Sequence, residues 1–188
     1  MSDFPARSAV ILPGGVGGPY APLPAFAGEA AENRGAEIHR VFWSAARNPR
    51  ELTDSERSGW VAEQVEPVLA DRSPLLIGKS LGTHAAAIAA QRALPAVWLT
   101  PLLGADEVVS ALRRATVPFL LVGGTDDPTW NGALARSLTP YILEVADADH
   151  GMFVPGPLAA SAAVLGTVVT AVEQFLDEVI WPDHEAES

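Results

Sequence analysis

The sequence contains no cysteine. This absence excludes disulfide bonds, thiolate catalysis and metal sites built on cysteine ligands. The chain has only four histidines as well, so a transition-metal site is not expected. A cysteine-free composition suits a reducing compartment, and we therefore expect a cytoplasmic protein that works without a cofactor.

Basic residues are also scarce, because 12 Lys and Arg stand against 23 Asp and Glu and give a formal net charge of −11. Nucleic acids and anionic membranes bind basic surfaces, so neither is expected as a partner. The stretch Met1 to Pro5 carries an acid where a signal peptide would be basic, and no apolar run looks long enough to span a bilayer. The partner we expect is a small-molecule acyl substrate, with the protein either a monomer or a homodimer.

Short apolar runs alternate with helical patterns along most of the chain. The expected strands are residues 8–12, 38–43, 75–77, 96–99, 118–122 and 141–145. This alternation predicts an α/β fold, a three-layer doubly wound parallel sheet of about six strands. His39 and Arg40 indicate that the second strand is an edge, and right-handed crossovers then give the order 2-1-3-4-5-6. The length of 188 residues fits one domain, which we place at 8–181 with loose termini at 1–7 and 182–188.

The pentapeptide Gly-Lys-Ser-Leu-Gly at 78–82 lies between an apolar strand and an alanine-rich helix expected over 81–93. In that setting it predicts a nucleophile elbow, a sharp turn that lifts the Ser80 hydroxyl clear of the sheet. The N–H groups and dipole at the start of the helix favour negative charge on a substrate oxygen. A P-loop is not indicated, because Ser73 stands where that motif needs a glycine. The alternative to an elbow is a tight turn without chemistry.

Lys79, the residue before the serine, is interpreted as a charged residue on the far side of the strand.

A glycine-rich loop follows the first strand, with four glycines in five positions between Pro13 and Pro19. Such a backbone can point several N–H groups at one ligand, as an oxyanion site requires. In the predicted strand order the switch point lies between strands one and three, which brings this loop beside Ser80. A merely flexible connection is the alternative.

Two further residues follow the ends of later strands, Asp127 after the fifth and His150 after the sixth. With Ser80 they give the chain order of nucleophile, acid and histidine found in α/β-hydrolases. The chain resembles a small α/β-hydrolase over residues 8–180, through the elbow at 78–82, Gly-Thr-Asp-Asp-Pro at 124–128 and Asp-His-Gly-Met-Phe at 149–153. The first two strands of that family have no counterpart, and only one helix fits between strands four and five. The resemblance therefore implies a trimmed, lidless version of the fold.

The resemblance also implies roles for these side chains. Ser80 would attack a carbonyl carbon, and His150 would accept its proton and later protonate the leaving group. Asp127 would orient the imidazole and stabilise its charged form. Asp126 is an alternative for the acid, because the register of that turn is not fixed by sequence.

The oxyanion of such a reaction would be held by the backbone N–H groups of Leu81 and Gly15, with Val16 as the near alternative to Gly15. The implied activity is that of a carboxylesterase or thioesterase-like serine hydrolase, which cleaves an ester, thioester or related acyl bond through an acyl-enzyme. Without a lid, its site would be open and suited to small acyl groups. Two alternatives stay open: an acyltransferase on the same fold, and a non-catalytic binding or scaffold protein that retains the fold.

Other polar and aromatic residues are weaker candidates. His84 is interpreted as a packed histidine, and Asp147 and Asp149 as solvated loop charges. Trp130 and Tyr20 flank the expected mouth of the site, as pocket lining or as core.

Overall fold

The computed structural model describes residues 7–182, so the predicted loose termini lie almost wholly outside it. The strands are β1 (Ser8–Leu12), β2 (Glu37–Arg40), β3 (Leu75–Lys79), β4 (Ala96–Leu99), β5 (Phe119–Gly124) and β6 (Ile142–Val145). The helices are α1 (Pro22–Glu32), α2 (Asp54–Leu69), α3 (Ala86–Arg92), α4 (Asp106–Arg114), α5 (Gly132–Leu138) and α6 (Leu158–Phe175). Short 3-10 turns cover Gly18–Tyr20, Pro49–Glu51 and Ser80–Ala85, and a π-helical turn, Leu176–Ile180, extends α6.

All six strands form one parallel sheet in the order β2-β1-β3-β4-β5-β6, which confirms the predicted topology. The second strand is an edge, as expected. β2 is added on one side of β1 and β3 on the other, so the order of the strands changes direction between β1 and β3. At that switch point Leu12 is in register with Gly78. The loops that follow β1 and β3 therefore leave the same edge of the sheet side by side.

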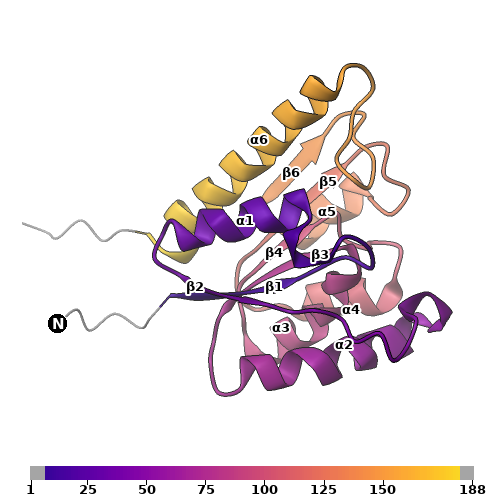
Figure 1. Ribbon diagram of the computed structural model, residues 1–188, viewed down its shortest axis with the longest axis vertical. Coiled ribbons are helices and arrows are strands. Elements are labelled where there is room, and N and C mark those ends of the chain that lie inside the picture. The colour runs from indigo at the N-terminus through magenta and orange to yellow at the C-terminus, as the bar shows by residue number, and fades with distance from the viewer. Residues whose placement is uncertain (1–6, 183–188) are drawn as a thin grey trace, which may run out of the picture.

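Helices cover both faces of the sheet (Figure 1). Side chains alternate between the faces along each strand. In β1, Ala9 and Ile11 pack with α1 and α6, whereas Val10 and Leu12 pack with α2, α3 and α4. The three layers follow from this alternation, because each face of the central strands is apolar.

The start of α2 shows how local sequence sets an element boundary. Thr53 accepts a hydrogen bond from the N–H of Glu56, and the Glu56 carboxylate accepts one from the N–H of Thr53 at 2.8 Å. This is the capping box that the Thr-x-x-Glu pattern predicts.

Two element boundaries differ from the sequence expectation. The edge strand ends at Arg40 rather than at Trp43, because the chain turns inward there: the Trp43 indole donates to the carbonyl of Pro13 at 3.0 Å and packs against Trp60. The helix expected over 81–93 is a 3-10 helix up to Ala85, and α3 itself begins only at Ala86. The α-helix dipole therefore starts further from Ser80 than predicted.

The expectation that no segment is long enough to span a bilayer was wrong. One helical segment, Leu158–Ile180, has 23 residues and a mean hydropathy of 1.5, so it passes that test by length and composition alone. The same segment packs on the sheet through Val168, Val172 and Phe175. Packing of one side of α6 on β5 and β6 accounts for part of this apolar character, while most of the segment's apolar window is not buried.

Candidate active site

Ser80 lies where β3 ends and the 3-10 helix begins. Its φ of +49° is a left-handed conformation, which costs a non-glycine residue about 1 kcal/mol or more. Two glycines make this turn possible. A Cβ on Gly78 would lie 2.5 Å from the Trp98 ring, and one on Gly82 would overlap the carbonyl oxygen of Leu12. The strained strand-to-helix turn predicted from the sequence is present, and Ser80 lines a pocket.

Hydrogen bonds join the side chains of Ser80, His150 and Asp127. His150 Nε2 lies 2.8 Å from Ser80 Oγ, and His150 Nδ1 lies 2.8 Å from Asp127 Oδ2. With its proton on Nδ1, the imidazole donates to Asp127 and accepts from the Ser80 hydroxyl, so one tautomer satisfies both bonds. The Asp127 side chain is fully shielded from solvent, whereas that of His150 is 36% exposed. The structure thus brings together the three residues that the sequence placed after β3, β5 and β6.

Asp127 is held in place by its own loop. Its Oδ1 accepts hydrogen bonds from the Thr129 N–H and the Thr129 hydroxyl, each at 2.8 Å. Burial by itself would raise the pKa of Asp127, but the hydrogen bonds from His150 and Thr129 outweigh burial and lower the pKa below its usual value. The carboxylate facing His150 is therefore ionised at neutral pH.

The structure distinguishes between the two candidate acids. Asp126 is exposed and turned away, with its N–H bonded to the carbonyl of Ala148, while Asp127 is buried against His150. Asp147 and Asp149 are exposed, as expected for loop charges. Asp149 also shapes the loop, because its side chain accepts hydrogen bonds from two N–H groups that follow His150.

The pocket that contains Ser80, here called the serine pocket, has a volume of about 340 Å³. Both residues predicted for the oxyanion site, Leu81 and Gly15, line it, and so does the alternative Val16. Gly14 was not predicted, yet it is buried and a Cβ placed on it would lie 3.7 Å from the Cβ of Ser80. The glycine loop thus lies directly against the elbow, and both Gly15 and Val16 stay candidates.

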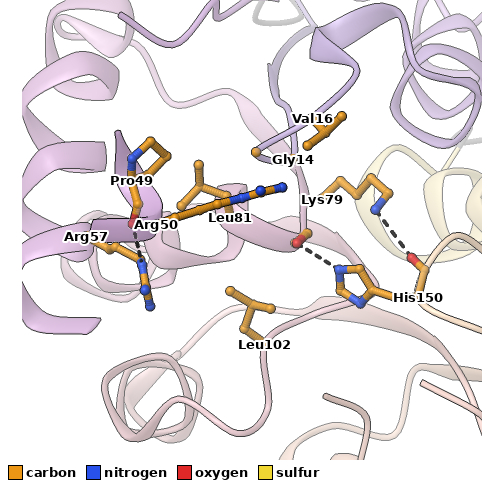
Figure 2. Close-up of a pocket in the computed structure, with 11 residues that line it drawn as sticks. Gly14, Val16, Pro49, Arg50, Arg57, Lys79, Leu81, Leu102 and His150 are labelled. Carbon is orange, nitrogen blue, oxygen red and sulfur yellow. Dashed lines mark hydrogen bonds between the residues drawn. The ribbon is translucent and has the colours of Figure 1, made fainter. Parts of the chain in front are cut away.

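Lys79 does not lie on the far side of the strand, and that interpretation was wrong. Its side chain lines the serine pocket, and its ammonium group donates to the carbonyl oxygen of His150 at 3.4 Å (Figure 2). Burial lowers the pKa of Lys79, against the opposing pull of the Asp127 and Asp149 carboxylates. Lys79 therefore packs within the site rather than facing bulk solvent.

A second pocket, here called the apolar pocket, adjoins the first. It has a volume of about 460 Å³ and shares Val16 and Lys79 with the serine pocket. The rest of its wall comes from the start of α1, the loop after His150 and the start of α6, including Leu23, Met152, Phe153, Leu158, Ala162 and Leu165. No sequence signal pointed to it, because these segments lie far apart in the chain.

Several residues at the site were not predicted. Thr129 had a readable signal, since Asp-Pro-Thr is the pattern of a turn in which an aspartate accepts from the N–H two residues later. Arg50 and Leu102 line the serine pocket from connections that carry no motif, and Arg57 lines it from the first turn of α2. Spatial proximity alone identifies them.

Other residues singled out in the sequence lie outside the site. His84 is buried, with Nδ1 3.0 Å from the Ser58 hydroxyl, as expected for a packed histidine. Trp130 and Tyr20 line neither pocket. The Trp130 indole donates to Glu144 at 2.7 Å, and the Tyr20 ring packs against Phe42 at an interplanar angle of 50°.

Neither a protein-family model nor a curated protein sequence matches the chain. Solved structures do match. Est1E from Butyrivibrio proteoclasticus has a TM-score of 0.68 at 15% identity, covering 95% of this chain and 90% of that one. Dienelactone hydrolase from Anabaena variabilis has a TM-score of 0.63 at 18% identity, covering 94% and 88%. XC6422 from Xanthomonas campestris, a serine hydrolase without a lid, has a TM-score of 0.58 at 14% identity, covering 93% and 85%.

This chain has the α/β-hydrolase fold. The resemblance inferred from the motifs is confirmed for the fold, and the single helix α4 between β4 and β5 agrees with the lidless arrangement.

Proposed function

We propose that this protein is a serine hydrolase that cleaves an ester, thioester or related acyl bond through an acyl-enzyme. One observation carries the proposal: an unbroken hydrogen-bonded chain from Ser80 through His150 to a buried, ionised Asp127. A serine hydroxyl becomes a useful nucleophile only when a positioned base takes its proton, and this arrangement supplies that base.

The proposed reaction uses each group in turn. Ser80 Oγ attacks the carbonyl carbon while His150 Nε2 accepts the hydroxyl proton, and Asp127 stabilises the imidazolium. The oxyanion accepts hydrogen bonds from the N–H of Leu81 and from Gly15 or Val16. His150 then protonates the leaving group. In the second half of the reaction it activates a water that releases the acid and restores Ser80.

The structural neighbours support a hydrolytic reaction, because they include an esterase, a dienelactone hydrolase and a lidless serine hydrolase. Between residues 7 and 182 no inserted domain covers the serine pocket, which favours small or exposed acyl groups. The scaffold alternative predicts that His150 lies out of reach of Ser80, and a separation of 2.8 Å speaks against it. The acyltransferase alternative has no feature of its own in the structure that favours it.

Hydrolysis of p-nitrophenyl acetate by the wild type and by Ser80→Ala tests this function. We expect the variant to lose activity by a factor of about 10³ or more, because no other group can form the acyl-enzyme. Ser110→Ala, which changes an exposed serine on α4, is the matched control and should keep wild-type activity. Equal rates in the wild type and Ser80→Ala would contradict the proposal.

The cytoplasmic location and the choice between monomer and homodimer stay predictions from the sequence. Size-exclusion chromatography with light scattering measures the second directly.

A further inference from the structure

The charged residues that line the serine pocket are all cationic. They are Arg50, Arg57 and Lys79, and no carboxylate is among the lining residues. The whole chain, in contrast, carries a formal charge of −11, with 12 basic residues in total. A quarter of the basic residues thus line the pocket where substrate would bind. Such a cluster of positive charge produces a local electrostatic potential that attracts anions.

Two of these three cations already have partners. Arg57 forms an ion pair with Asp54 and donates to the carbonyl of Pro49 at 2.8 Å. The Lys79 ammonium donates to the His150 carbonyl and lies within the field of Asp127 and Asp149. Neither side chain is therefore fully available to a ligand.

Arg50 differs from them. Its guanidinium makes no hydrogen bond, ion pair or ring contact within residues 7–182. Figure 2 shows the Arg50 side chain extending from beside Pro49, past Leu81, in the direction of Lys79. An arginine presents several N–H donors in a planar fork that matches a carboxylate, so this unpaired group is a ready anion-binding element.

The backbone that carries Arg50 is held by its neighbours. The N–H of Arg50 donates to the Asn48 side chain at 3.1 Å, and the Asn48 amide donates to Glu51 at 3.0 Å. Arg57 fixes the same turn from the other side through its bond to the Pro49 carbonyl. Glu51, the nearest acid in sequence, is thus bonded to Asn48 rather than to Arg50. The local structure thus fixes the backbone that carries Arg50 and leaves its exposed guanidinium without a partner among residues 7–182.

We infer that Arg50 binds a carboxylate of the substrate, so that Ser80 acts on an ester or thioester whose acyl or alcohol part is negatively charged. This inference rests on the proposed function and names its substrate class. Arg50 is then a specificity-determining residue, which touches the substrate but takes no part in proton transfer. Arg57 is a positioning residue for the Pro49 turn.

The test compares charged and neutral esters of matched size. For the acyl side, the pair is mono-p-nitrophenyl adipate and p-nitrophenyl hexanoate; for the alcohol side, it is p-acetoxybenzoate and phenyl acetate. The measured quantity is the ratio of kcat/KM for the charged ester to kcat/KM for the neutral one. Comparing this ratio between enzyme variants cancels the intrinsic reactivity of each ester.

In Arg50→Gln, we expect the ratio to fall about tenfold for one of the two pairs, as befits the loss of one charge-assisted contact. The pair that responds shows which side of the substrate carries the charge.

Arg47→Gln is the matched control. It removes an exposed arginine of the same connection that does not line the pocket, and should leave both ratios within about twofold of wild type. Arg50→Lys should retain part of the preference. Added salt should reduce the preference in wild type and have little effect in Arg50→Gln.

Two negative results differ in meaning. If the neutral esters are hydrolysed in a Ser80-dependent way and Arg50→Gln changes neither ratio, the inference is overturned and the proposed function stands. If no ester is hydrolysed in a Ser80-dependent way by any variant, the proposed function fails and the inference fails with it.

Discussion

The serine pocket and the apolar pocket share Val16 and Lys79 in their walls but differ in their chemistry. The serine pocket is the smaller, at about 340 Å³, and combines the elbow, the glycine loop and three cations. The apolar pocket, at about 460 Å³, is lined mainly by aliphatic and aromatic side chains, and large apolar residues such as Leu158 and Phe153 are exposed at its wall.

This difference reflects where each pocket lies in the fold. The serine pocket opens at the switch point of the sheet, where the loops that follow β1 and β3 lie side by side. The apolar pocket lies between α1, α6 and the loop after His150, where helix faces leave a gap. We propose that the serine pocket binds the reacting and charged parts of a substrate, whereas the apolar pocket has room for an apolar group. We expect Ser80 to react with substrates that extend into either pocket.

The largest effect should come from disabling the proposed triad, on which a substrate in either pocket would depend. Asp127→Asn keeps the shape of the side chain but removes the charge that holds His150 in its productive tautomer. We expect kcat to fall by about 10³-fold or more for every substrate, charged or apolar, since the proton transfer itself is lost. Steady-state kinetics on both ester pairs checks this.

Asp126→Asn is the control for that change, because it neutralises the adjacent but exposed carboxylate. Its kcat should equal that of the wild type. If Asp126→Asn were the damaging change instead, the assignment of the acid would be wrong.

A smaller effect should separate the pockets. Ala162 is an exposed residue of α6 that lines the apolar pocket, so Ala162→Phe would fill part of that space. We expect kcat/KM for p-nitrophenyl octanoate to fall about fivefold, while that for p-nitrophenyl acetate stays unchanged, because only the longer chain would reach the pocket.

Ala163→Phe adds the same ring on the exposed surface of α6, outside the pocket lining, and should leave both rates as in the wild type. An equal loss for octanoate and acetate in Ala162→Phe would mean that the apolar pocket has no separate role in binding.

The sheet and the elbow could be predicted because they rest on local patterns. Buried parallel strands are short apolar runs, and the carboxyl ends of such strands meet at one edge of the sheet. The position of Ser80 followed from the glycines at 78 and 82, which the structure shows to be required by close contacts.

Other features depend on contacts that no local pattern encodes. The choice between Asp126 and Asp127 depends on the register of one turn, fixed by hydrogen bonds to Thr129 and His150. Arg50 reaches the serine pocket from the long connection between β2 and α2, whose path is set by Arg57 and Asn48. Lys79 keeps the extended backbone of β3, with φ −111° and ψ 131°, and lies on the same face of the sheet as Ile77. Its orientation was misjudged because the sequence does not show that two pockets meet at this end of the strand.

The most direct test of the account is covalent labelling of the protein with a fluorophosphonate, followed by intact-mass measurement and peptide mapping. The account predicts a single adduct on Ser80, absent in Ser80→Ala and formed far more slowly in His150→Gln, because the hydroxyl reacts only when its proton is taken. An unlabelled wild-type protein, or an adduct on any other residue, would contradict it.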